Sequence, residues 1–382
     1  MNRNRLRFAV LGLIAVLALA LAAGAGAAPS KKGGKAGKSE SEHVQPPVET
    51  SEGSLEQLPG RLGCLSSGKA ASKLCGRARA LKGAGPGVGS RAIAISPDGR
   101  NVYVAASGAD AIAVFDRSRA TGALSQPQGK AGCVASVAGT AKGSGGCGLA
   151  TGLDAPNSVA VSPDGRTVYA TARDSSAVLT FHRNRATGRL RQLPPSASGC
   201  ISGQPIQGCT AGRALKWPDV VVVSPDGKNV YVGDFAGSGV ISFSRAAGSG
   251  ALTQLGGTSG CITEAGAEGC AKGVQMNHIE GMAINPAGST VYAAAAFSSA
   301  ISILQREPAT GALTQAPNEN GCITVAAVAG CAQGYEFSGV NALVVSPKGG
   351  NVYATSLTSN SVTTFTPTNG GGLAQAARPT GE

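Results

Sequence analysis

The stretch "AISPDGRNVYVAAS", Ala94–Ser107, returns four more times along the chain with small changes. The copies are "AVSPDGRTVYATAR" from Ala160, "VVSPDGKNVYVGDF" from Val222, "AINPAGSTVYAAAA" from Ala283 and "VVSPKGGNVYATSL" from Val344. Their aligned positions, Ser96, Ser162, Ser224, Asn285 and Ser346, are 66, 62, 61 and 61 residues apart. Repetition at a period of this length is typical of solenoids and propellers.

Each repeat predicts four short strands. In the second copy, the apolar strand 158–161 leads into a Ser-Pro-Asp-Gly turn, in which Pro presets φ and Gly accepts a positive φ. A strand with Val168 and Tyr169, a strand over 177–181 and a short strand over 190–193 follow. Hairpin-sized loops join all four, so the unit is an antiparallel meander. Because both of its faces are apolar, it needs neighbours, and four-stranded repeats arranged radially make a β-propeller.

We therefore predict an all-β protein, a β-propeller with five four-stranded blades of about 61 residues over 54–382. The segments "SPDGRNVYVA" and "RATGAL", followed by a Gly-Cys loop, resemble the secreted YVTN-type and lactonase-like β-propeller repeats. The resemblance covers residues from Ser54 to the C-terminus. It implies the propeller fold and, as one candidate activity, lactone hydrolysis. Members of that family are usually described with seven blades.

All ten cysteines fall into pairs between a fourth strand and the next first strand. An even count at regular spacing in an exported chain predicts disulfides, whereas a metal site needs four ligands in one place. No C-x-x-C spacing supports a redox role. The predicted bridges are Cys64–Cys75, Cys133–Cys147, Cys200–Cys209, Cys261–Cys270 and Cys322–Cys331.

The first cysteine pair also predicts how the ring closes. "SLEQLPGRLGC" before Cys64 matches "ALTQLGGTSGC" before Cys261, so the propeller begins with a fourth strand. We expect the last blade to take this N-terminal strand as its outer edge, because closure removes exposed edges. The segment from Leu373 to Ala376 is a weaker candidate for the same edge and is expected to add outside it or to fray.

A ring of polar residues is predicted at the mouth of the central channel. The residue five positions before each turn serine or asparagine is polar, although an apolar strand follows it directly. One interpretation is that these groups bind channel water and neighbouring blades; the other is a ligand or cation site. The five residues are Arg91, Asn157, Asp219, Glu280 and Asn341.

Two kinds of ligand are compatible with this ring. The oxygens of Asn157, Asp219, Glu280 and Asn341 suit Ca²⁺, and calcium-dependent lactonase propellers use a similar mixture. Arg91 favours an anionic substrate group instead.

Further side chains are expected near the mouth. Trp217 is either a sugar-binding platform or a packing residue, and His278 is a weak candidate for a general base. Arg173, Asp174 and Asp234 follow the second strands and could join the mouth.

The N-terminus predicts export. Three arginines precede the apolar run 8–22, and Ala25-Gly26-Ala27 is a small-x-small cleavage site, so residues 1–27 are predicted as a signal peptide. A retained anchor is the alternative; cleavage would leave no transmembrane span. Residues 28–53 are rich in Lys, Gly, Ser, Glu and Pro and are predicted as a disordered linker.

The sequence leaves two functions open. The first is a secreted binding or surface scaffold, a monomer that binds a small molecule, a glycan or an extracellular protein. The alternative is a lactonase-type hydrolase with a polar or calcium site at the channel mouth. The net charge of +12 comes without basic clusters interleaved with aromatic residues, so no nucleic-acid partner is predicted. The sequence contains no nucleophile elbow, phosphate loop, zinc motif or dinucleotide fingerprint.

Overall fold

The computed structural model describes residues 55–67, 75–84, 92–138 and 146–376. Glu56–Glu382 form one compact unit, and Met1–Leu55 are grouped apart from it. The predicted signal peptide and linker lie outside the described residues. None of the helices in the described residues is long and apolar enough to cross a membrane.

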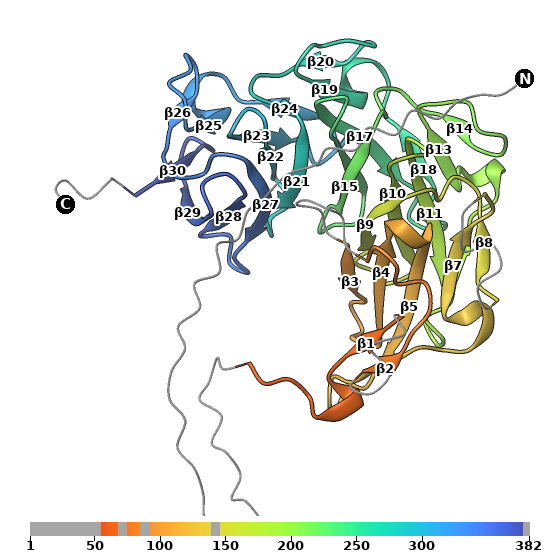
Figure 1. Ribbon diagram of the computed structural model, residues 1–382. Coiled ribbons are helices and arrows are strands. Elements are labelled where there is room, and N and C mark those ends of the chain that lie inside the picture. Colours follow the sequence, from red (N-terminus) through yellow and green to blue (C-terminus); the bar gives the residue numbers. More distant parts are fainter. Residues whose placement is uncertain (1–54, 68–74, 85–91, 139–145, 377–382) are drawn as a thin grey trace, which may run out of the picture. The chain divides into compact units, whose positions relative to one another are not determined.

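The second blade shows the plan of the repeat (Figure 1). Strands β9 (Pro156–Val161), β10 (Thr167–Ala172) and β11 (Ala177–Arg183) pair in antiparallel order. The turn between β9 and β10 is closed by Ser162, whose hydroxyl donates to Asp164 and accepts the backbone N–H of Thr167. Gly165 lies at φ +67°, a conformation that glycine adopts without strain.

The fourth strand of this blade is split in two. β12 (Leu190–Gln192) pairs with the end of β11, and β13 (Cys200–Ser202) pairs with its beginning. The short helix η5 (Pro195–Ala197) separates them. β14 (Thr210–Ala211) then returns parallel to β13 and carries the chain towards the next blade. We call the pair formed by β13 and β14, and its counterparts, the outer pair of a blade.

The same plan recurs in three more sheets, and within the described residues the last blade follows it without an outer pair. The first blade holds β3 (Ile93–Ile95), β4 (Asn101–Ala106), η3 (Ser107–Ala109), β5 (Ala111–Arg117), β6 (Leu124–Ser125), η4 (Gly129–Ala131), β7 (Cys133–Ser136) and β8 (Gly148–Ala150). The third holds β15 (Pro218–Val223), β16 (Asn229–Asp234), β17 (Gly239–Arg245), β18 (Leu252–Gln254), η6 (Gly257–Gly260), β19 (Cys261–Thr263) and β20 (Ala271–Lys272). The fourth holds β21 (Ile279–Ile284), β22 (Thr290–Ala295), β23 (Ala300–Arg306), β24 (Leu313–Gln315), η7 (Asn318–Asn320), β25 (Cys322–Thr324) and β26 (Ala332–Gln333). The fifth holds β27 (Val340–Val345), β28 (Val352–Ser356), β29 (Ser361–Pro367) and β30 (Leu373–Gln375).

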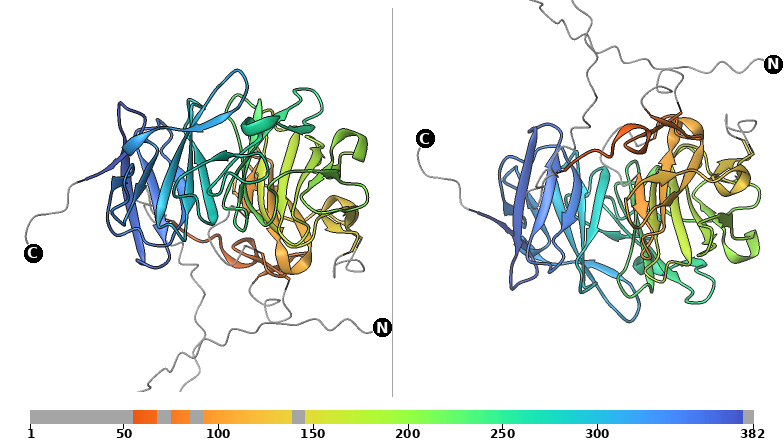
Figure 2. Two further views of the ribbon diagram at one scale, coloured as in Figure 1. Left: turned by 90° about the horizontal axis from the view of Figure 1, so that it is seen from above. Right: turned by 90° about the horizontal axis from the view of Figure 1, so that it is seen from below.

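Apolar side chains from adjacent blades pack together, as the repeat predicts. Tyr169 and Val178 of the second blade pack with Val230, Ile241 and Phe243 of the third. The inner strands contact one another in the order β3, β9, β15, β21, β27. In the two views of Figure 2 the blades follow one another in chain order, from orange through green to blue. The protein is thus an all-β propeller whose core lies between the blades, not within any one of them.

A polar joint of the same kind ties the first four blades to one another at three junctions. At the first joint, the Tyr103 hydroxyl donates to the Gly188 carbonyl and accepts from Arg183 Nε at 2.7 Å. The buried Arg183 guanidinium also donates to Asp98 at 2.9 Å. Tyr169 with Arg245 and Tyr231 with Arg306 repeat this arrangement at the next two joints. A charged hydrogen-bond network of this kind holds two neighbouring blades together.

The outer edge of the last blade differs from the prediction. β30 pairs with β29, and the Gln375 side chain exchanges two hydrogen bonds with the Tyr335 backbone. Leu373 is 2% exposed in the core of the last blade, whereas Leu55 is fully exposed. The predictions that the N-terminal strand closes the ring and that Leu373–Ala376 frays are therefore both wrong. β30 prevails because the turn at Gly371 brings it back at the small entropic cost of a very short loop.

The N-terminal segment packs at the other end of the row of blades. η1 (Gly60–Leu62) is followed by β1 (Leu65–Ser66) and β2 (Gly76–Arg77), a parallel pair with the pattern of β13 and β14. Leu65 packs on the first blade against Val102 and Phe115. Within the described residues β3 and β27 make no extensive contact, and Ile93 and Val344 are exposed, so the row of blades is open there.

All five predicted disulfides form. They link Cys64 to Cys75, Cys133 to Cys147, Cys200 to Cys209, Cys261 to Cys270 and Cys322 to Cys331. From the second pair on, each begins at the first residue of an outer pair and closes a loop of 9 to 14 residues on the way to the next blade. Five disulfides agree with folding in an oxidising compartment.

Candidate functional site

Polar residues occupy the second position of four neighbouring inner strands. Asn157 lies on β9, Asp219 on β15, Glu280 on β21 and Asn341 on β27. Because these strands contact one another in that order, their equivalent positions come side by side along the axis. Asn157, Asp219 and Glu280 are buried, and Asn341 is half-buried. The fifth predicted member, Arg91, lies outside the described residues.

Asp219 is held by the neighbouring blade. Asn157 Nδ2 donates to Asp219 Oδ1 at 2.5 Å, across the boundary between the second and third blades. Burial raises the pKa of Asp219 to about 6. The hydrogen bond from Asn157 and the charge of Arg173 oppose this rise in pKa, and the charge of Asp234 adds to it.

Glu280 carries the least satisfied carboxylate of the group. Burial, together with the negative charge of Asp219, raises the pKa of Glu280 to about 7. Its Oε2 atom is buried and has no hydrogen-bond partner among the described residues. A buried acid with an open acceptor atom and a pKa near neutrality is able to take up and release a proton at physiological pH.

Asn341 makes no side-chain hydrogen bond to Asp219 or Glu280 among the described residues. Its Oδ1 atom accepts a hydrogen bond from Thr355 Oγ1 of its own blade at 2.8 Å. Its backbone lies close to β21, because a side chain at Gly281 would come within 2.5 Å of the Asn341 carbonyl oxygen. The structure therefore links Asn157, Asp219 and Glu280 electrostatically and places Asn341 beside them without a shared hydrogen bond.

An aromatic cluster lies next to the carboxylates in the chain. The ring of His278, two residues before Glu280, stacks on Phe297 with centroids 3.9 Å apart and packs edge-on against Phe235 at 4.2 Å. Trp217, two residues before Asp219, lies 6.0 Å from Phe235. The Arg173 guanidinium lies 4.7 Å above the Trp217 ring, a cation–π contact.

Sequence reasoning missed Phe235 and Phe297. Phe235 follows β16 directly and Phe297 lies two residues after the end of β22, in a chain with only 4% aromatic residues. Because aromatic residues are rare in this chain, their occurrence in the loops equivalent to the loop of Arg173 is the signal that could have found them. Phe297 and Trp217 are exposed, so the cluster offers an aromatic surface to a ligand.

His278 combines two unusual features. Its φ is +60°, a left-handed conformation that is uncommon for residues other than glycine. Its Nδ1 atom is buried without a hydrogen-bond partner among the described residues, and burial lowers the pKa of the ring. At neutral pH the imidazole is therefore predominantly uncharged.

The two other predicted carboxylates have different roles. Asp234 is fully buried and accepts the backbone N–H groups of Lys216, Trp217 and Gly237. It thereby fixes the loop that carries Trp217. Asp174 is exposed and lies 3.9 Å from Arg173.

The donor set does not match the predicted calcium ion. Ca²⁺ takes six to eight oxygen ligands. The described residues contain no group of three or more His, Cys, Asp or Glu side chains placed to hold a metal. Asn157 directs an N–H donor at Asp219, and Asn341 Oδ1 is engaged by Thr355. The described side chains do not fit a calcium cage, and no chemical step is derived through a metal.

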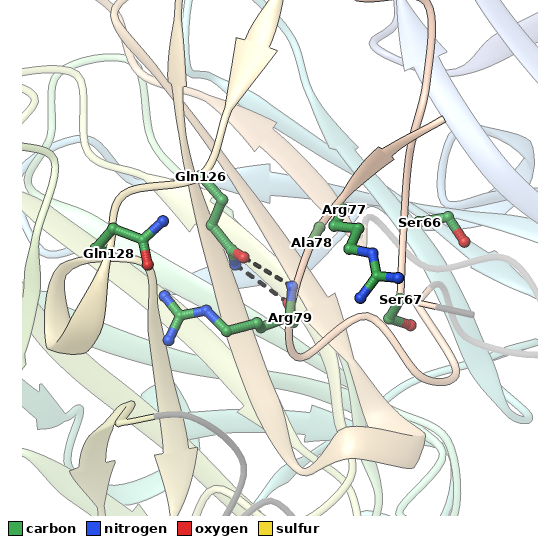
Figure 3. A pocket seen from close by; sticks show the side chains of 7 residues that line it. All are labelled: Ser66, Ser67, Arg77, Ala78, Arg79, Gln126 and Gln128. Atoms are coloured by element: carbon green, nitrogen blue, oxygen red, sulfur yellow. Dashed lines mark hydrogen bonds between the residues drawn. The ribbon is translucent and has the colours of Figure 1, made fainter. Parts of the chain in front are cut away.

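A polar pocket elsewhere has a structural origin (Figure 3). It lies between β1–β2 and the β6–η4 segment and is lined by Ser66, Ser67, Arg77, Ala78, Arg79, Gln126 and Gln128. Gln126 exchanges two hydrogen bonds with the Arg79 backbone, drawn as dashed lines in Figure 3. Gln192, Gln254, Gln315 and Gln375 make the same clamp in the other blades. The pocket is the first copy of a repeated blade contact and shares no residue with the axial carboxylates.

The fold is that of a β-propeller, and solved structures of similar fold are known. Two solved structures reach a TM-score of 0.50: a proposed 6-phosphogluconolactonase from Bacteroides fragilis and a protein from Lactobacillus plantarum. The first is 16% identical over 74% of this chain and 68% of its own; the second is 15% identical over 75% and 69%. No protein-family model and no curated protein matches the sequence. At this identity the likeness establishes the fold alone.

Proposed function

We propose that this protein is an exported hydrolase of cyclic esters, with Glu280 as its general base. The observation that carries the proposal is the buried, unpartnered Oε2 atom of Glu280 beside the ionisable Asp219. Burial of a second acid without a compensating cation is unfavourable for folding, and such costs are concentrated at functional sites. The fold shared with a proposed 6-phosphogluconolactonase supports a lactone as the substrate class.

The reaction needs one proton acceptor and one proton donor in turn. Ionised Glu280 removes a proton from water while the oxygen of that water adds to the lactone carbonyl. The tetrahedral intermediate then breaks its ring C–O bond, and the protonated Glu280 returns its proton to the leaving oxygen. Lactone and water are thereby converted into the open hydroxy acid, and Glu280 is regenerated.

The surrounding groups have supporting roles in this proposal. Asp219, fixed by Asn157, raises the pKa of Glu280 through its charge. Arg173, whose charge acts on Asp219 and which lies over Trp217, would stabilise the negative charge that develops on the carbonyl oxygen. Trp217 and Phe297 offer apolar rings against which a sugar face can stack.

The test measures acid release from glucono-δ-lactone with a pH indicator, after subtraction of spontaneous hydrolysis. The wild-type rate should rise with pH through an apparent pKa near 7. Glu280→Gln should lower kcat/KM at least 100-fold, the usual contribution of general-base catalysis. Glu319→Gln, an exposed acid in η7, is the matched control and should keep full activity.

A binding scaffold is the second candidate, favoured by the exposed Trp217 and Phe297 rings. The same experiment separates the two functions. A folded wild-type protein that binds sugar lactones by calorimetry, without accelerating their hydrolysis, would support the scaffold and overturn the hydrolase.

A further inference from the structure

The last blade presents an open face where every other blade is covered. We call Val344, Tyr353 and Val362 the forward face, since their counterparts in earlier blades point at the following blade. Val362 is 73% exposed, whereas the residues at its position in the other blades, Ile112, Val178, Val240 and Ile301, are 0% exposed. Tyr353 is 37% exposed, against 2% or less for Tyr103, Tyr169, Tyr231 and Tyr292. The forward face is therefore an interface of the repeat without its partner.

The first blade presents the opposite open face. We call Ile93, Arg117 and Gly122 the rear face, since their counterparts point at the preceding blade. Ile93 is 64% exposed, whereas its counterparts Val159, Val221, Met282 and Leu343 are buried. Arg117 pairs with Leu124 in the register in which Arg183 pairs with Leu190. Arg117 is thus the counterpart of the arginine that closes each internal joint.

The two faces carry matching halves of that joint. At an internal joint, the tyrosine hydroxyl donates to a glycine carbonyl of the next blade and accepts from its arginine. Tyr353 offers the hydroxyl, which has no hydrogen-bond partner among the described residues, and Asn351 stands where Asn101 receives Arg183. Gly122 and Arg117 offer the carbonyl and the guanidinium.

In the part of the chain that the structure describes, the last blade lacks an outer pair, and the N-terminal segment supplies an outer pair without a blade. β29 pairs with β30 only through Phe365, Thr366 and Pro367, and the last sheet has four strands where the others have six. In the fourth blade the beginning of β23 pairs with β25, and the beginning of β29 has no corresponding partner strand among the described residues. β1–β2 is an outer pair of this kind, and it packs on the first blade without inner strands of its own.

We infer that a second copy of this chain docks head to tail, with the forward face of one copy on the rear face of the next. β1–β2 of the next copy would then complete the last blade beside β29. Within the described residues the same chain leaves both faces exposed, because β3 and β27 make no extensive contact. Such a contact is heterologous, so each copy keeps one free end and can add another. The inference does not rest on the proposed hydrolase.

One charge limits the strength of the contact. Lys348 occupies the position at which Asp98, Asp164 and Asp226 pair with the arginine of the next blade. In the docked pair it would face Arg117, and like charges repel. The net charge of +12 opposes association as well. Salt screens both effects, so association should become stronger as ionic strength rises.

The experiment measures the mass of the full chain by light scattering over a concentration series, at low and high salt. The wild type should exceed one chain mass as concentration increases, and more so at high salt. Val362→Asp on the forward face and Ile93→Asp on the rear face should each abolish association. An equimolar mixture of the two variants should form a species of two chains, because each retains one intact face. Both positions are exposed in the single chain, so folding should be unaffected.

A variant expected to associate more tightly provides an independent test. Lys348→Asp should lower the dissociation constant about tenfold by restoring a charged hydrogen bond to Arg117, and Arg117→Ala in that background should reverse the gain. A wild-type protein at one chain mass under every condition would overturn the inference. So would a mixture of the two face variants that remains at one chain mass.

Discussion

Asn157 and Asp219 form a side-chain hydrogen bond of 2.5 Å between the second and third blades, and it joins the carboxylate pair to the packing of the propeller. The pair is costly for the fold, since burial raises the pKa of Asp219 to about 6 and that of Glu280 to about 7. Acidic groups with raised pKa values bind protons in the folded state that they have already lost in the unfolded state. Their ionisation therefore favours unfolding.

The first prediction is that the protein becomes less stable as pH rises and these two acids ionise. Between pH 4.5, the ordinary pKa of a glutamate, and pH 7, the folded protein binds more protons than the unfolded chain, so the free energy of unfolding should fall as pH rises. Glu280 alone accounts for up to about 3 kcal/mol of this fall. Urea unfolding at pH 5, 6 and 7 measures it. Glu280→Gln should flatten the profile, and a wild-type profile that rises over this range would contradict the prediction.

The second prediction compares two arginines at the same repeat position. Arg183 is fully buried and bonded to Tyr103 and Asp98, so Arg183→Ala should destabilise the protein by about 3 kcal/mol or more. Arg117 lies at the open end, and its one side-chain hydrogen bond among the described residues goes to the Gly99 carbonyl at 3.3 Å. Arg117→Ala should cost less than about 1 kcal/mol. Urea midpoints at low protein concentration measure both changes in stability. Equal losses of stability in the two variants would refute a stabilising role of the joint.

The third prediction concerns the edge of the last blade. Leu373 is buried against the core that contains Phe365, so Leu373→Ala should cost about 2–4 kcal/mol. Leu55, in the similar segment "SLEQL", is fully exposed, and Leu55→Ala should be neutral. Truncation through Leu58 should likewise be tolerated. If that truncation instead causes aggregation while loss of β30 is harmless, the N-terminal strand closes the blade in solution.

The fourth prediction concerns the disulfides. Non-reducing peptide mapping should find the five local pairs and no free thiol. Replacing both Cys261 and Cys270 by serine should cost about 2–3 kcal/mol, because a loop of 9 residues is released in the unfolded chain. Cooperative unfolding should persist, since packing between blades is the larger stabilising contribution. Loss of all folded signal in the double variant would show that the disulfide does more than restrict the unfolded chain.

The repeat determined what the sequence could predict. The Ser-Pro-Asp-Gly turns and the cysteine spacing are local signals, and the strands and disulfides formed where they indicated. The closing strand was mispredicted because "SLEQL" and "GLAQA" carry the same local pattern. Their difference lies in long-range contacts, because Leu373 packs in the core of the last blade whereas Leu55 is fully exposed.

The candidate site was only partly predictable for the same reason. Asn157, Asp219 and Glu280 could be placed in one row from the register of the repeat. The unpartnered oxygen of Glu280 and the rings of Phe235 and Phe297 around His278 depend on side-chain geometry between blades, which no periodicity encodes.

The last prediction tests whether Asp219 tunes Glu280. The negative charge of Asp219 contributes to the raised pKa of Glu280, so Asp219→Asn should lower that pKa while burial keeps it above 4.5. The carboxyl signal of isotopically labelled Glu280, followed by NMR titration, measures this without reference to catalysis. In the hydrolysis assay, the pH at half-maximal rate should shift downward by the same amount. Asp174→Asn, which removes an exposed charge from the adjacent loop, is the matched control and should leave the titration unchanged. If Asp219→Asn also leaves it unchanged, the two carboxylates are electrostatically independent, and the pairing on which the proposed mechanism depends is refuted.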